Sequence, residues 1–438
     1  MTHTEAHRVV IIGGGAGGLE LAAKLGQKFG PQHVFLVDKA GDHIWKPSLH
    51  EVAAGTLDIH REGLSYFMLA KDKGFTFIFG EVAHIDREAR RILLEPVFSD
   101  QQIEIFPART LPYDTLVLAV GSKSNFFGTP GAAEFAIALD STEEAERFRL
   151  RLLHQLVTAN QKKSDHASYQ LNIGIVGGGA TGVELAAELR EACADAVFYG
   201  LNSLDPQKDI QITLLEGADR ILSALSPKMS AAAQQLLTDR GISVKTSVRV
   251  ARIEADALYD SNDVRYPVDL CVWAAGIEAP AFLKLLGLPT NRINQLVVDG
   301  GLRSSDPSIF AMGDCAQVPW GEGEQGQFLP AKAQVAHQQA VFLLPIMAER
   351  IQGKEVQARQ FQFRDYGSLV SVGHTRGVGS LMGVLTGKNW FVQGLLARMM
   401  YMSLHLMHHF AILGFLRTTS LALGRLLMKR GRPRVKLH

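Results

Sequence analysis

Two glycine-rich turns hold the residues of this chain that are best suited to chemistry. The first is a GxGxxG pattern, Gly13, Gly15 and Gly18, between a short apolar run and an Ala/Leu-rich segment. In such a turn the first glycine permits a sharp bend, the second lets the backbone approach a pyrophosphate, and the third allows close packing of helix on strand. The start of the helix adds unpaired N–H groups and partial positive charge. The pattern predicts a dinucleotide-phosphate site, which also includes Gly17.

An acidic residue follows this first turn at the expected place. Asp38 ends the strand-like run HVFLVD, about 20 residues after the last glycine, where a carboxylate accepts from a ribose hydroxyl. Lys39 comes next in the chain, and we include it among the predicted nucleotide-binding residues. A strand before the turn, a helix after it and an acid at this distance make the pattern far more specific than GxGxxG alone.

The second turn repeats the pattern at Gly177, Gly179 and Gly182, with Ala180 and Thr181 in the same loop. Glu216 ends the following run, IQITLLE, after a longer interval that predicts an extended helix or loop. A carboxylate there binds a 2′-hydroxyl and repels a 2′-phosphate, although Arg220 is close by in sequence. The second turn therefore predicts NADH in preference to NADPH.

An internal repeat must position these turns. The run Arg8–Leu25, RVVIIGGGAGGLELAAKL, is echoed by Asn172–Leu189, NIGIVGGGATGVELAAEL. Two further strand-like runs, Thr115–Gly121 and Leu270–Gly276, end in small residues that we include as cofactor-binding. Strands that alternate with helical patterns predict an α/β protein with two Rossmann-type domains and mainly parallel sheets. Two dinucleotide sites in one chain predict two bound dinucleotides that exchange a hydride, and FAD with NADH is the simplest such pair.

The order of the elements also predicts how the domains are divided. The run Ser308–Asp314, SIFAMGD, lies well after the second turn and indicates that the chain returns to the first domain. We therefore expect an FAD-binding domain from residues 1–120 and 290–340, and an NADH-binding domain from 121–289. Residues 341–438 then form a β-rich and helical C-terminal region that associates with a membrane.

Composition excludes several classes. The three cysteines, Cys193, Cys271 and Cys315, form no CxxC pair, which is typical of a reducing compartment and not of a disulfide scaffold. The N-terminus shows no secretion signal, and no apolar stretch reaches the roughly 18 residues of a spanning helix. The formal net charge is +1, but Asp365 is the last acidic residue, so the end of the chain is basic.

The motifs together resemble a known family, the bacterial type II NADH dehydrogenases, which are single-subunit NADH:quinone oxidoreductases that pump no protons. The similarity is to the proteobacterial members and runs essentially end to end. The matching runs are HIWKPSLHEVAAGTLD (His43–Asp58), AVGSKSNFFGTPG (Ala119–Gly131), the second glycine turn, VWAAGI (Val272–Ile277), TNRINQLVVD (Thr290–Asp299), FAMGDCA (Phe310–Ala316) and AKAQVAHQ (Ala331–Gln338). Of these, the AQxAxQ run Ala333–Gln338 is the more specific one.

The resemblance implies roles for particular residues. Asp314, after Gly313, would bond the ribityl or pyrophosphate part of FAD, and Val82 would meet its adenine end. Lys46 and Pro47 would lie near the flavin ring, and Glu184 would lie near the junction of nicotinamide and flavin. Ala333 would contact the cofactor, whereas the side chains of two glutamines would line the quinone site: Gln334 and Gln338.

Physical alternatives stand beside two of these roles. Gln334 and Gln338 are four residues apart and share a helix face, where their amides could hold quinone carbonyls or simply face solvent. The N-terminus of that helix would stabilise a reduced flavin anion. Glu184 comes two residues after Gly182, where it could orient nicotinamide, relay a proton, or merely favour the first turn of a helix.

The C-terminal region predicts contact with a lipid surface. Apolar residues recur at helical spacing: Leu395, Met399, Met402, Leu406, Phe410 and Leu413. Basic residues without acidic neighbours accompany them: Arg398, Arg417, Arg425, Lys429, Arg430, Arg432, Arg434 and Lys436. We predict monotopic attachment to anionic lipid on the cytoplasmic face of the cell membrane, against the alternative of packing on the core. His405, His408 and His409 favour packing over a metal site, because no acid or thiol follows Asp365.

Other functions fit less well. A disulfide reductase or an NADH peroxidase would need cysteine after the first acidic strand, and that region has none. Nucleic-acid binding would need a recognised module beside the basic end. An NADH-dependent ferredoxin reductase-like enzyme and an NADH-binding redox sensor remain as alternatives to the quinone reductase. The acceptor would be ubiquinone or menaquinone, and a homodimer is left open.

Overall fold

The computed structural model describes residues 6–59, 63–166, 168–320, 327–373, 376–382, 389–428 and 436. The chain divides into two compact units, each made of three segments. The first unit consists of Met1–Trp45, Gly63–Lys123 and Ile277–Arg364, and the second of Lys46–Glu62, Ser124–Gly276 and Asp365–His438. The domain boundaries expected from the sequence remain predictions.

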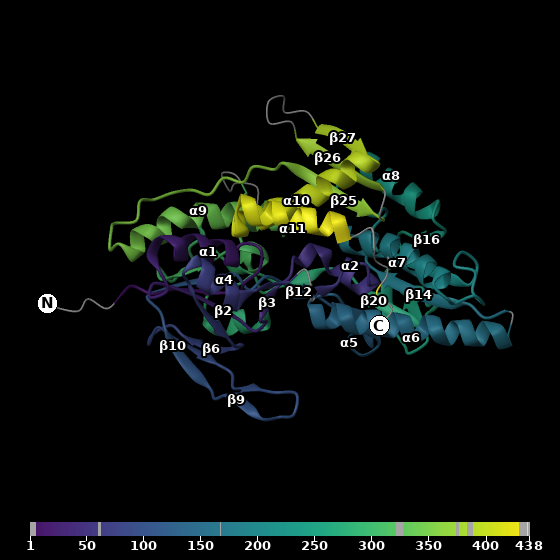
Figure 1. Cartoon of the computed structure of the whole chain (residues 1–438), viewed down its shortest axis with the longest axis horizontal. Helices are drawn as coiled ribbons and strands as arrows, with labels where there is room; N and C mark the ends of the chain where they lie inside the picture. The colour runs from purple at the N-terminus through teal and green to yellow at the C-terminus, as the bar shows by residue number, and fades with distance from the viewer. Residues whose placement is uncertain are drawn as a thin grey trace. The chain divides into compact units, whose positions relative to one another are not determined.

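The first unit is built on a five-stranded parallel sheet in the order β23-β11-β1-β2-β5 (Figure 1). Its strands are β1 (Val9–Ile12), β2 (Val34–Asp38), β5 (Thr76–Phe79), β11 (Thr115–Leu118) and β23 (Ile309–Ala311). The central strand, VVII, is buried along its whole length, as apolar β-branched runs are in sheets covered on both faces. Strand β23 pairs with β11, which is the return of the chain that the run SIFAMGD predicts.

The second unit repeats this design. Its parallel sheet has the order β13-β20-β14-β15-β16, and the second copy of the repeat supplies the central strand (Figure 1). The strands are β13 (Ala136–Ala138), β14 (Leu171–Val176), β15 (Ile210–Leu215), β16 (Ile242–Lys245) and β20 (Leu270–Trp273). Two Rossmann-type cores in one α/β chain are therefore confirmed.

A helix follows each glycine turn. Helix α1 (Gly18–Phe29) has 12 residues, and helix α7 (Ala180–Phe198) has 19. The longer helix, with the turns that follow it, accounts for the long interval between Gly182 and Glu216. Helix α9 (Ala333–Ile351), which contains Pro345, packs along α1 in the first unit. In the second unit, α2 (Leu49–Ala54) packs against both α7 and α6 (Thr142–Asp165).

The C-terminal part of the second unit is a three-stranded antiparallel sheet followed by two helices (Figure 1). The elements are β25 (Gly367–Val372), β26 (Arg376–Met382), β27 (Asn389–Gln393), α10 (Leu395–Leu413) and α11 (Phe415–Met428). Gly414, with φ of +84°, separates the two helices. Within the described residues, neither these helices nor any other has the length and apolar character needed to cross a membrane.

The remaining elements are short or peripheral. Each unit carries a three-stranded antiparallel sheet: β6 (Val82–Asp86), β7 (Arg91–Leu94) and β10 (Arg109–Pro112) in the first, β17 (Val250–Ile253), β18 (Ala257–Asp260) and β19 (Arg265–Pro267) in the second. The others are β3 (Asp42–His43), η1 (Lys46–Ser48), β4 (Leu64–Ser65), α4 (Tyr66–Lys73), β8 (Val97–Phe98), β9 (Glu104–Phe106), β12 (Lys123–Ser124), α5 (Ala132–Phe135), α8 (Pro227–Thr238), β21 (Ile277–Glu278), η2 (Ala281–Leu286), β22 (Leu296–Val297), η3 (Gly313–Cys315) and β24 (Ala316–Gln317).

Candidate functional site

The first glycine turn has the geometry of a phosphate cradle. Gly13 has φ of +102°, and a Cβ atom there would collide with the main chain of Ala119. A Cβ on Gly18 would collide with the carbonyl oxygen of Gly13, so the third glycine lets the helix approach the strand. Gly15, in contrast, faces open space, with no atom within 4 Å of an added Cβ. The turn therefore fits a dinucleotide phosphate beside Gly15.

Polar side chains hold this turn in place. The Gly14 N–H donates to Asp38 Oδ2 over 2.6 Å, and the Ala40 N–H donates to Oδ1 over 2.8 Å. The carbonyl oxygen of Gly14 accepts from His43 Nδ1 at 2.9 Å and from the Tyr66 hydroxyl at 2.7 Å. Burial raises the pKa of Asp38, and these two N–H groups act against that rise. The acid thus braces the loop at the position from which it would reach a ribose.

The second glycine turn is nearly a copy of the first. Gly177 has φ of +109° and would collide with Ala274 if it carried a Cβ, and Gly182 would collide with Gly177. Gly179 faces open space, as Gly15 does. The Gly178 N–H donates to Glu216 Oε2 over 2.6 Å. A second dinucleotide phosphate therefore fits here, with Glu216 in the place of the ribose-binding acid.

The Arg220 side chain is bonded to its own loop. Its guanidinium donates to three main-chain carbonyl oxygens of the adjoining loop, those of Leu222, Ser223 and Leu225. The Glu216 carboxylate also accepts from the Ala218 N–H over 2.7 Å. Arg220, the basic residue closest in sequence to Glu216, thus stabilises its own loop.

Gly313 and Asp314, from the run FAMGDCA, add further polar groups to the first unit. Asp314 Oδ2 accepts from the Ser122 hydroxyl over 2.8 Å, and the Gly313 N–H donates to Gln339 Oε1 over 2.7 Å. Gln339 is fully buried. Cys315 is also buried, and burial raises the pKa of its thiol to about 12, so the thiol is unreactive at neutral pH.

The two glutamines of the AQxAxQ run lie at the start of α9, but their side chains differ. Gln334 Oε1 is buried and accepts no hydrogen bond within the described residues. Gln338 makes two bonds to the main chain of Arg364: its Nε2 donates to the carbonyl oxygen over 2.8 Å, and its Oε1 accepts from the N–H over 3.0 Å. The Oε1 of Gln334 could therefore accept a hydrogen bond from a ligand, whereas both polar atoms of the Gln338 amide are bonded to Arg364.

Glu184 is a buried carboxyl on α7. It is 6 % exposed and accepts from the Ser371 N–H over 3.0 Å. Its Oε2 lies 3.6 Å from Nδ1 of His50, which is also buried. Burial raises the pKa of Glu184 to about 8, and the negative charges of Glu51 and Glu188 act in the same direction. The hydroxyl of Tyr401, from α10, faces the same carboxyl and favours its charged form.

A carboxyl with this pKa is mostly protonated at neutral pH and can exchange a proton near that pH. The alternative that Glu184 merely favours the first turn of a helix is wrong, because its side chain is buried and the first turn of α7 holds no acidic residue.

The other predicted site residues lie in these two units. In the first unit are Gly17 (N-cap of α1), Lys39 (its ammonium 3.2 Å from Glu81), Val82 (first residue of β6), Gly121 (φ +67°) and Ala333 (first residue of α9). In the second unit are Lys46 (first residue of η1), Ala180 and Thr181 (start of α7) and Gly276 (φ +70°).

The C-terminal basic residues are only partly described. Arg430, Arg432 and Arg434, together with Lys429, lie outside the described residues. Lys436 is described, and its ammonium faces Asp58 and Glu146. The three histidines of α10 are packed together: the rings of His405 and His409 stack at 4.5 Å, and His408 is buried.

Several residues around these sites were not singled out from the sequence. Five of them contact a predicted site residue: His50, Gln339, Ser122, Ser371 and Tyr401. The other two, His43 and Tyr66, bond to Gly14 of the first glycine turn. His43 and His50 belong to the run HIWKPSLHEVAAGTLD, which was noted as a motif. The motif was the available signal, but only the fold shows that His50 meets a residue 134 positions away.

Comparison with known proteins agrees with these two units. The family model for pyridine nucleotide-disulphide oxidoreductases matches residues 7–340. A type II NADH:quinone oxidoreductase of Haemophilus influenzae is 38 % identical, with 98 % of this chain and 99 % of that protein covered. Another from Mycobacterium tuberculosis, NdhA, is 27 % identical, covering 92 % of this chain and 83 % of that protein.

A solved structure shares the fold. The structure of NDH2 from Plasmodium falciparum in complex with NADH superposes with a TM-score of 0.78 at 19 % identity, covering 98 % of this chain and all of that one. At that identity the likeness shows the fold alone, whereas the relative from H. influenzae shows the family. The chain belongs to the pyridine nucleotide-disulphide oxidoreductases and, among them, to the type II NADH:quinone oxidoreductases.

Proposed function

We propose that the chain oxidises NADH on its second unit and passes two electrons, through FAD held by its first unit, to a membrane quinone. In the net reaction NADH and one proton from solution reduce the quinone to quinol and leave NAD⁺. The observation that carries the proposal is the pair of glycine turns, each with an open space beside its middle glycine. Bound FAD supplies the two-electron relay between nucleotide and quinone.

The first unit is assigned to FAD because it offers more polar groups than a phosphate turn alone. Asp38 stands at the ribose position, and Asp314, oriented by Ser122, would reach the ribityl or pyrophosphate part. Val82 follows the strand beside Asp38 and would meet the adenine. Lys46, in the second unit, is proposed near the flavin ring on the resemblance alone.

The second unit is assigned to NADH. The Glu216 carboxylate would accept from the ribose 2′-hydroxyl and would repel a 2′-phosphate. Arg220 is bonded to loop carbonyls, so it offers that phosphate no ready partner. NADH is therefore preferred to NADPH.

Glu184 is proposed as the group that holds a proton for the reaction. Quinone reduction takes up two protons with its two electrons, and the hydride brings only one of them. A carboxyl with a pKa near 8 can deliver a proton at neutral pH and recover it from solution.

Gln334 is proposed as the quinone ligand of the AQxAxQ run. Its Oε1 is buried and accepts no hydrogen bond from the described residues, and rotation of the amide would present its N–H₂ group to a quinone carbonyl instead. Gln338, by its two bonds to Arg364, is better suited to holding the neighbouring segment.

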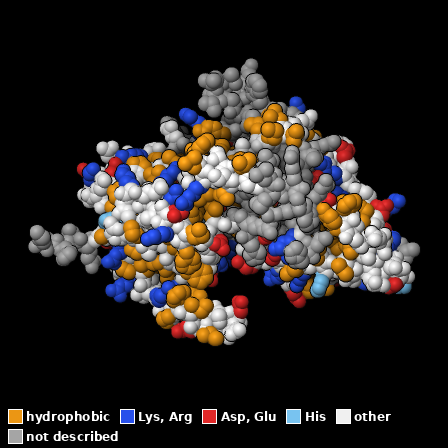
Figure 2. Space-filling model, viewed as in Figure 1, with side chains coloured by type: hydrophobic (Ala, Val, Ile, Leu, Met, Phe, Trp, Pro, Cys, Tyr) orange, Lys and Arg blue, Asp and Glu red, His pale blue; other side chains and the backbone are white. Residues whose placement is uncertain are grey.

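The C-terminal helices are proposed to rest on the cytoplasmic face of the cell membrane. Their exposed apolar side chains are Leu395, Leu396, Met399, Met402, Leu404, Met407, Phe410, Phe415, Leu416, Leu421 and Leu423. Hydrophobic side chains gather over α10 and α11 in the space-filling view (Figure 2). A patch of this kind beside basic residues is typical of an interfacial helix on anionic lipid. The arrangement would bring the enzyme to a lipid-dissolved acceptor.

Anaerobic mixing tests the reaction. The purified, flavin-loaded protein should lose its flavin absorbance with NADH and regain it when a short-chain ubiquinone or menaquinone is added. Fast bleaching by NADH without any acceleration of recovery by quinone would contradict the quinone half of the proposal. Vesicles that contain anionic phospholipid should sediment the protein, and a chain shortened at residue 394 should stay in solution.

A further inference from the structure

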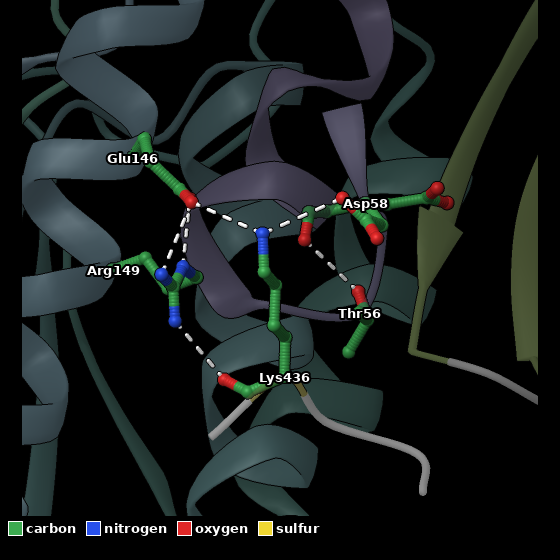
Figure 3. Close-up of polar contacts among 6 residues, drawn as sticks. Thr56, Asp58, Glu146, Arg149 and Lys436 are labelled. Carbon is green, nitrogen blue, oxygen red and sulfur yellow. Dashed lines mark hydrogen bonds and ion pairs between the residues drawn. The ribbon is translucent and has the colours of Figure 1, made fainter. Parts of the chain in front are cut away.

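Lys436 is bonded to two helices of the second unit (Figure 3). The main-chain N–H of Lys436 donates to the carbonyl oxygen of Gly55 over 2.8 Å. Its carbonyl oxygen accepts from Arg149 Nη1 over 3.1 Å. Gly55 ends α2 and Arg149 belongs to α6, so Lys436 bridges these two helices through its backbone.

The ammonium of Lys436 completes a set of matched charges. It lies 3.4 Å from Asp58 Oδ1 and 3.4 Å from Glu146 Oε1. Arg149, whose side chain is only 4 % exposed, also pairs with Glu146, over 2.7 and 3.0 Å. Burial would raise the pKa of Glu146, but Arg149 and Lys436 together bring it below its ordinary value. Two cations thus balance two carboxylates in a half-buried cluster.

The turn after α2 is shaped to receive this residue. Gly55 has φ of +79°, and a Cβ there would lie 3.3 Å from Cδ of Arg149 and 3.4 Å from the carbonyl oxygen of Lys436. A left-handed conformation without a side chain is therefore required at the point where the chain end docks. Three groups of Lys436 are thus bonded to the surrounding helices and turn: its N–H, its carbonyl oxygen and its ammonium.

This anchored segment leads directly to Glu184. Thr56, next to Gly55, donates its hydroxyl to Glu188 Oε1 over 2.6 Å. Glu188 lies one helical turn after Glu184 on α7. On the other side of Gly55, α2 carries His50, whose Nδ1 is 3.6 Å from Glu184. A residue that fixes Gly55 and Asp58 therefore also restrains the segment of α2 that carries His50.

We propose that Lys436 is a positioning residue that holds the end of α2 against α6 and so keeps His50 and Glu51 of α2 beside Glu184. The inference rests on the role of Glu184 in the proposed function and adds the end of the chain to its support. Lys436 was expected among the cations that meet lipid, and its engagement with Asp58 and Glu146 gives it a different task.

The effect of losing the anchor has a defined direction. The groups that face Glu184 are His50 and Glu51 from α2, Glu188 from α7, the Ser371 N–H from β25 and Tyr401 from α10. If α2 loosens, water enters and the charge of Glu51 moves away. Both changes lower the pKa of Glu184 from about 8 toward its ordinary value, because burial is the main cause of the rise.

The test compares full-length, flavin-loaded variants. Lys436→Gln removes the ammonium, Asp58→Asn weakens the same contact from the other side, and Lys436→Arg keeps the charge. Lys208→Gln is the matched control, because Lys208 makes an ion pair with Asp205 on the exposed surface of the same unit. Two quantities are measured: hydrogen exchange in residues 49–58, and the pH dependence of the anaerobic reoxidation of the NADH-reduced flavin by a short-chain quinone.

Lys436→Gln and Asp58→Asn should speed exchange in residues 49–58 and move the midpoint of the pH dependence down by about half a pH unit or more. Lys436→Arg should keep both the exchange rate and the midpoint close to those of the wild type. Lys208→Gln should change neither quantity. Faster exchange with an unmoved midpoint, or no change in either quantity, overturns the inference.

Glu184→Gln in the same assay separates this inference from the proposed function. If that variant loses the pH dependence while Lys436→Gln keeps the original midpoint, only the role of Lys436 fails. If Glu184→Gln keeps the pH dependence, the role of Glu184 fails, and the inference about Lys436 fails with it.

Discussion

In the first unit Glu20 comes two residues after the last glycine of the turn, and in the second unit Glu184 holds the same position. Both side chains are buried. Glu20 lies between two basic partners, Lys24 Nζ at 2.5 Å and His337 Nδ1 at 2.6 Å. Glu184 lies among carboxylates, with His50 at 3.6 Å, and its pKa is raised to about 8.

One position in the repeat contributes to this difference, beside the larger effect of burial. Four residues after the glutamate, the first copy has Lys24 and the second has Glu188, in the otherwise similar runs GLELAAKL and GVELAAEL. Residues four apart on a helix are neighbours, so an opposite charge there supports an ionised partner and a like charge disfavours it. The same glycine turn thus carries a structural ion pair in one unit and a proton-holding acid in the other.

The largest effects are expected where the two turns are most alike. Gly15→Leu and Gly179→Leu each fill the open space beside a middle glycine, where no protein atom lies within 4 Å of an added Cβ. Gly15→Leu should yield a folded but colourless protein. Gly179→Leu should keep its flavin, but its KM for NADH should rise on the order of 100-fold, because the pyrophosphate is displaced. Absorbance spectra and steady-state kinetics check both, and exchange of the two phenotypes would reverse the assignment of the units.

Glu184→Gln should slow turnover on the order of 100-fold with little change in the KM for NADH, because the amide keeps the shape but cannot release a proton. In the wild type the rate should fall as pH rises through about 8, where Glu184 loses its proton. The rate of the variant should not show this fall at alkaline pH. Steady-state rates from pH 6 to 10 decide the matter, and a variant as fast as the wild type would leave Glu184 without a role.

Lys24→Gln tests the other half of the comparison. It removes a partner of buried Glu20 in a pair that is itself partly exposed, with 34 % of the Lys24 side chain accessible. The free energy of unfolding should fall by about 1–2 kcal/mol, while kcat and its pH dependence should stay near those of the wild type. Denaturant unfolding followed by flavin release measures this. A change in the pH profile without a loss of stability would contradict a structural role for the pair.

Glu188→Gln should have the smallest effect. The amide can still accept from Thr56, but the negative charge near Glu184 is lost. The pKa of Glu184 should then fall slightly, since burial is the larger cause of its rise. The pH at which the rate falls to half should therefore decrease by about half a pH unit. Rates measured at closely spaced pH values would show this shift. An upward shift would mean that Glu188 does not act on Glu184 by its charge.

Local patterns made most of the fold predictable. Each glycine turn, its preceding strand and its acid lie within one βαβ segment, so spacing alone locates Gly13 and Asp38, or Gly177 and Glu216. The predicted end of the run HVFLVD at Asp38 agrees with the end of β2. The runs Thr115–Gly121 and Leu270–Gly276 extend three residues too far, because β11 ends at Leu118 and β20 at Trp273. The chain leaves the sheet before the small residues, which form the turn.

Contacts between distant segments were not predictable. The surroundings of Glu184 come from α2, β25 and α10, and no periodicity brings these together. The helix spacing of Gln334 and Gln338 was readable, but the bonds from Gln338 to Arg364 depend on the path of a segment without regular structure. Lys436 looked like one more cation of a basic tail until the fold placed two carboxylates beside it.

The central claim is that the second unit holds a protonated glutamate where the first holds an ion pair, and infrared difference spectroscopy tests it most directly. A pH titration of the flavin-loaded protein should show a carboxylic-acid carbonyl band that is present at pH 7 and disappears as pH rises through about 8. Glu184→Gln should lack that band. If the wild type shows no such band at pH 7, or if Glu184→Gln retains it, the account of Glu184 is wrong.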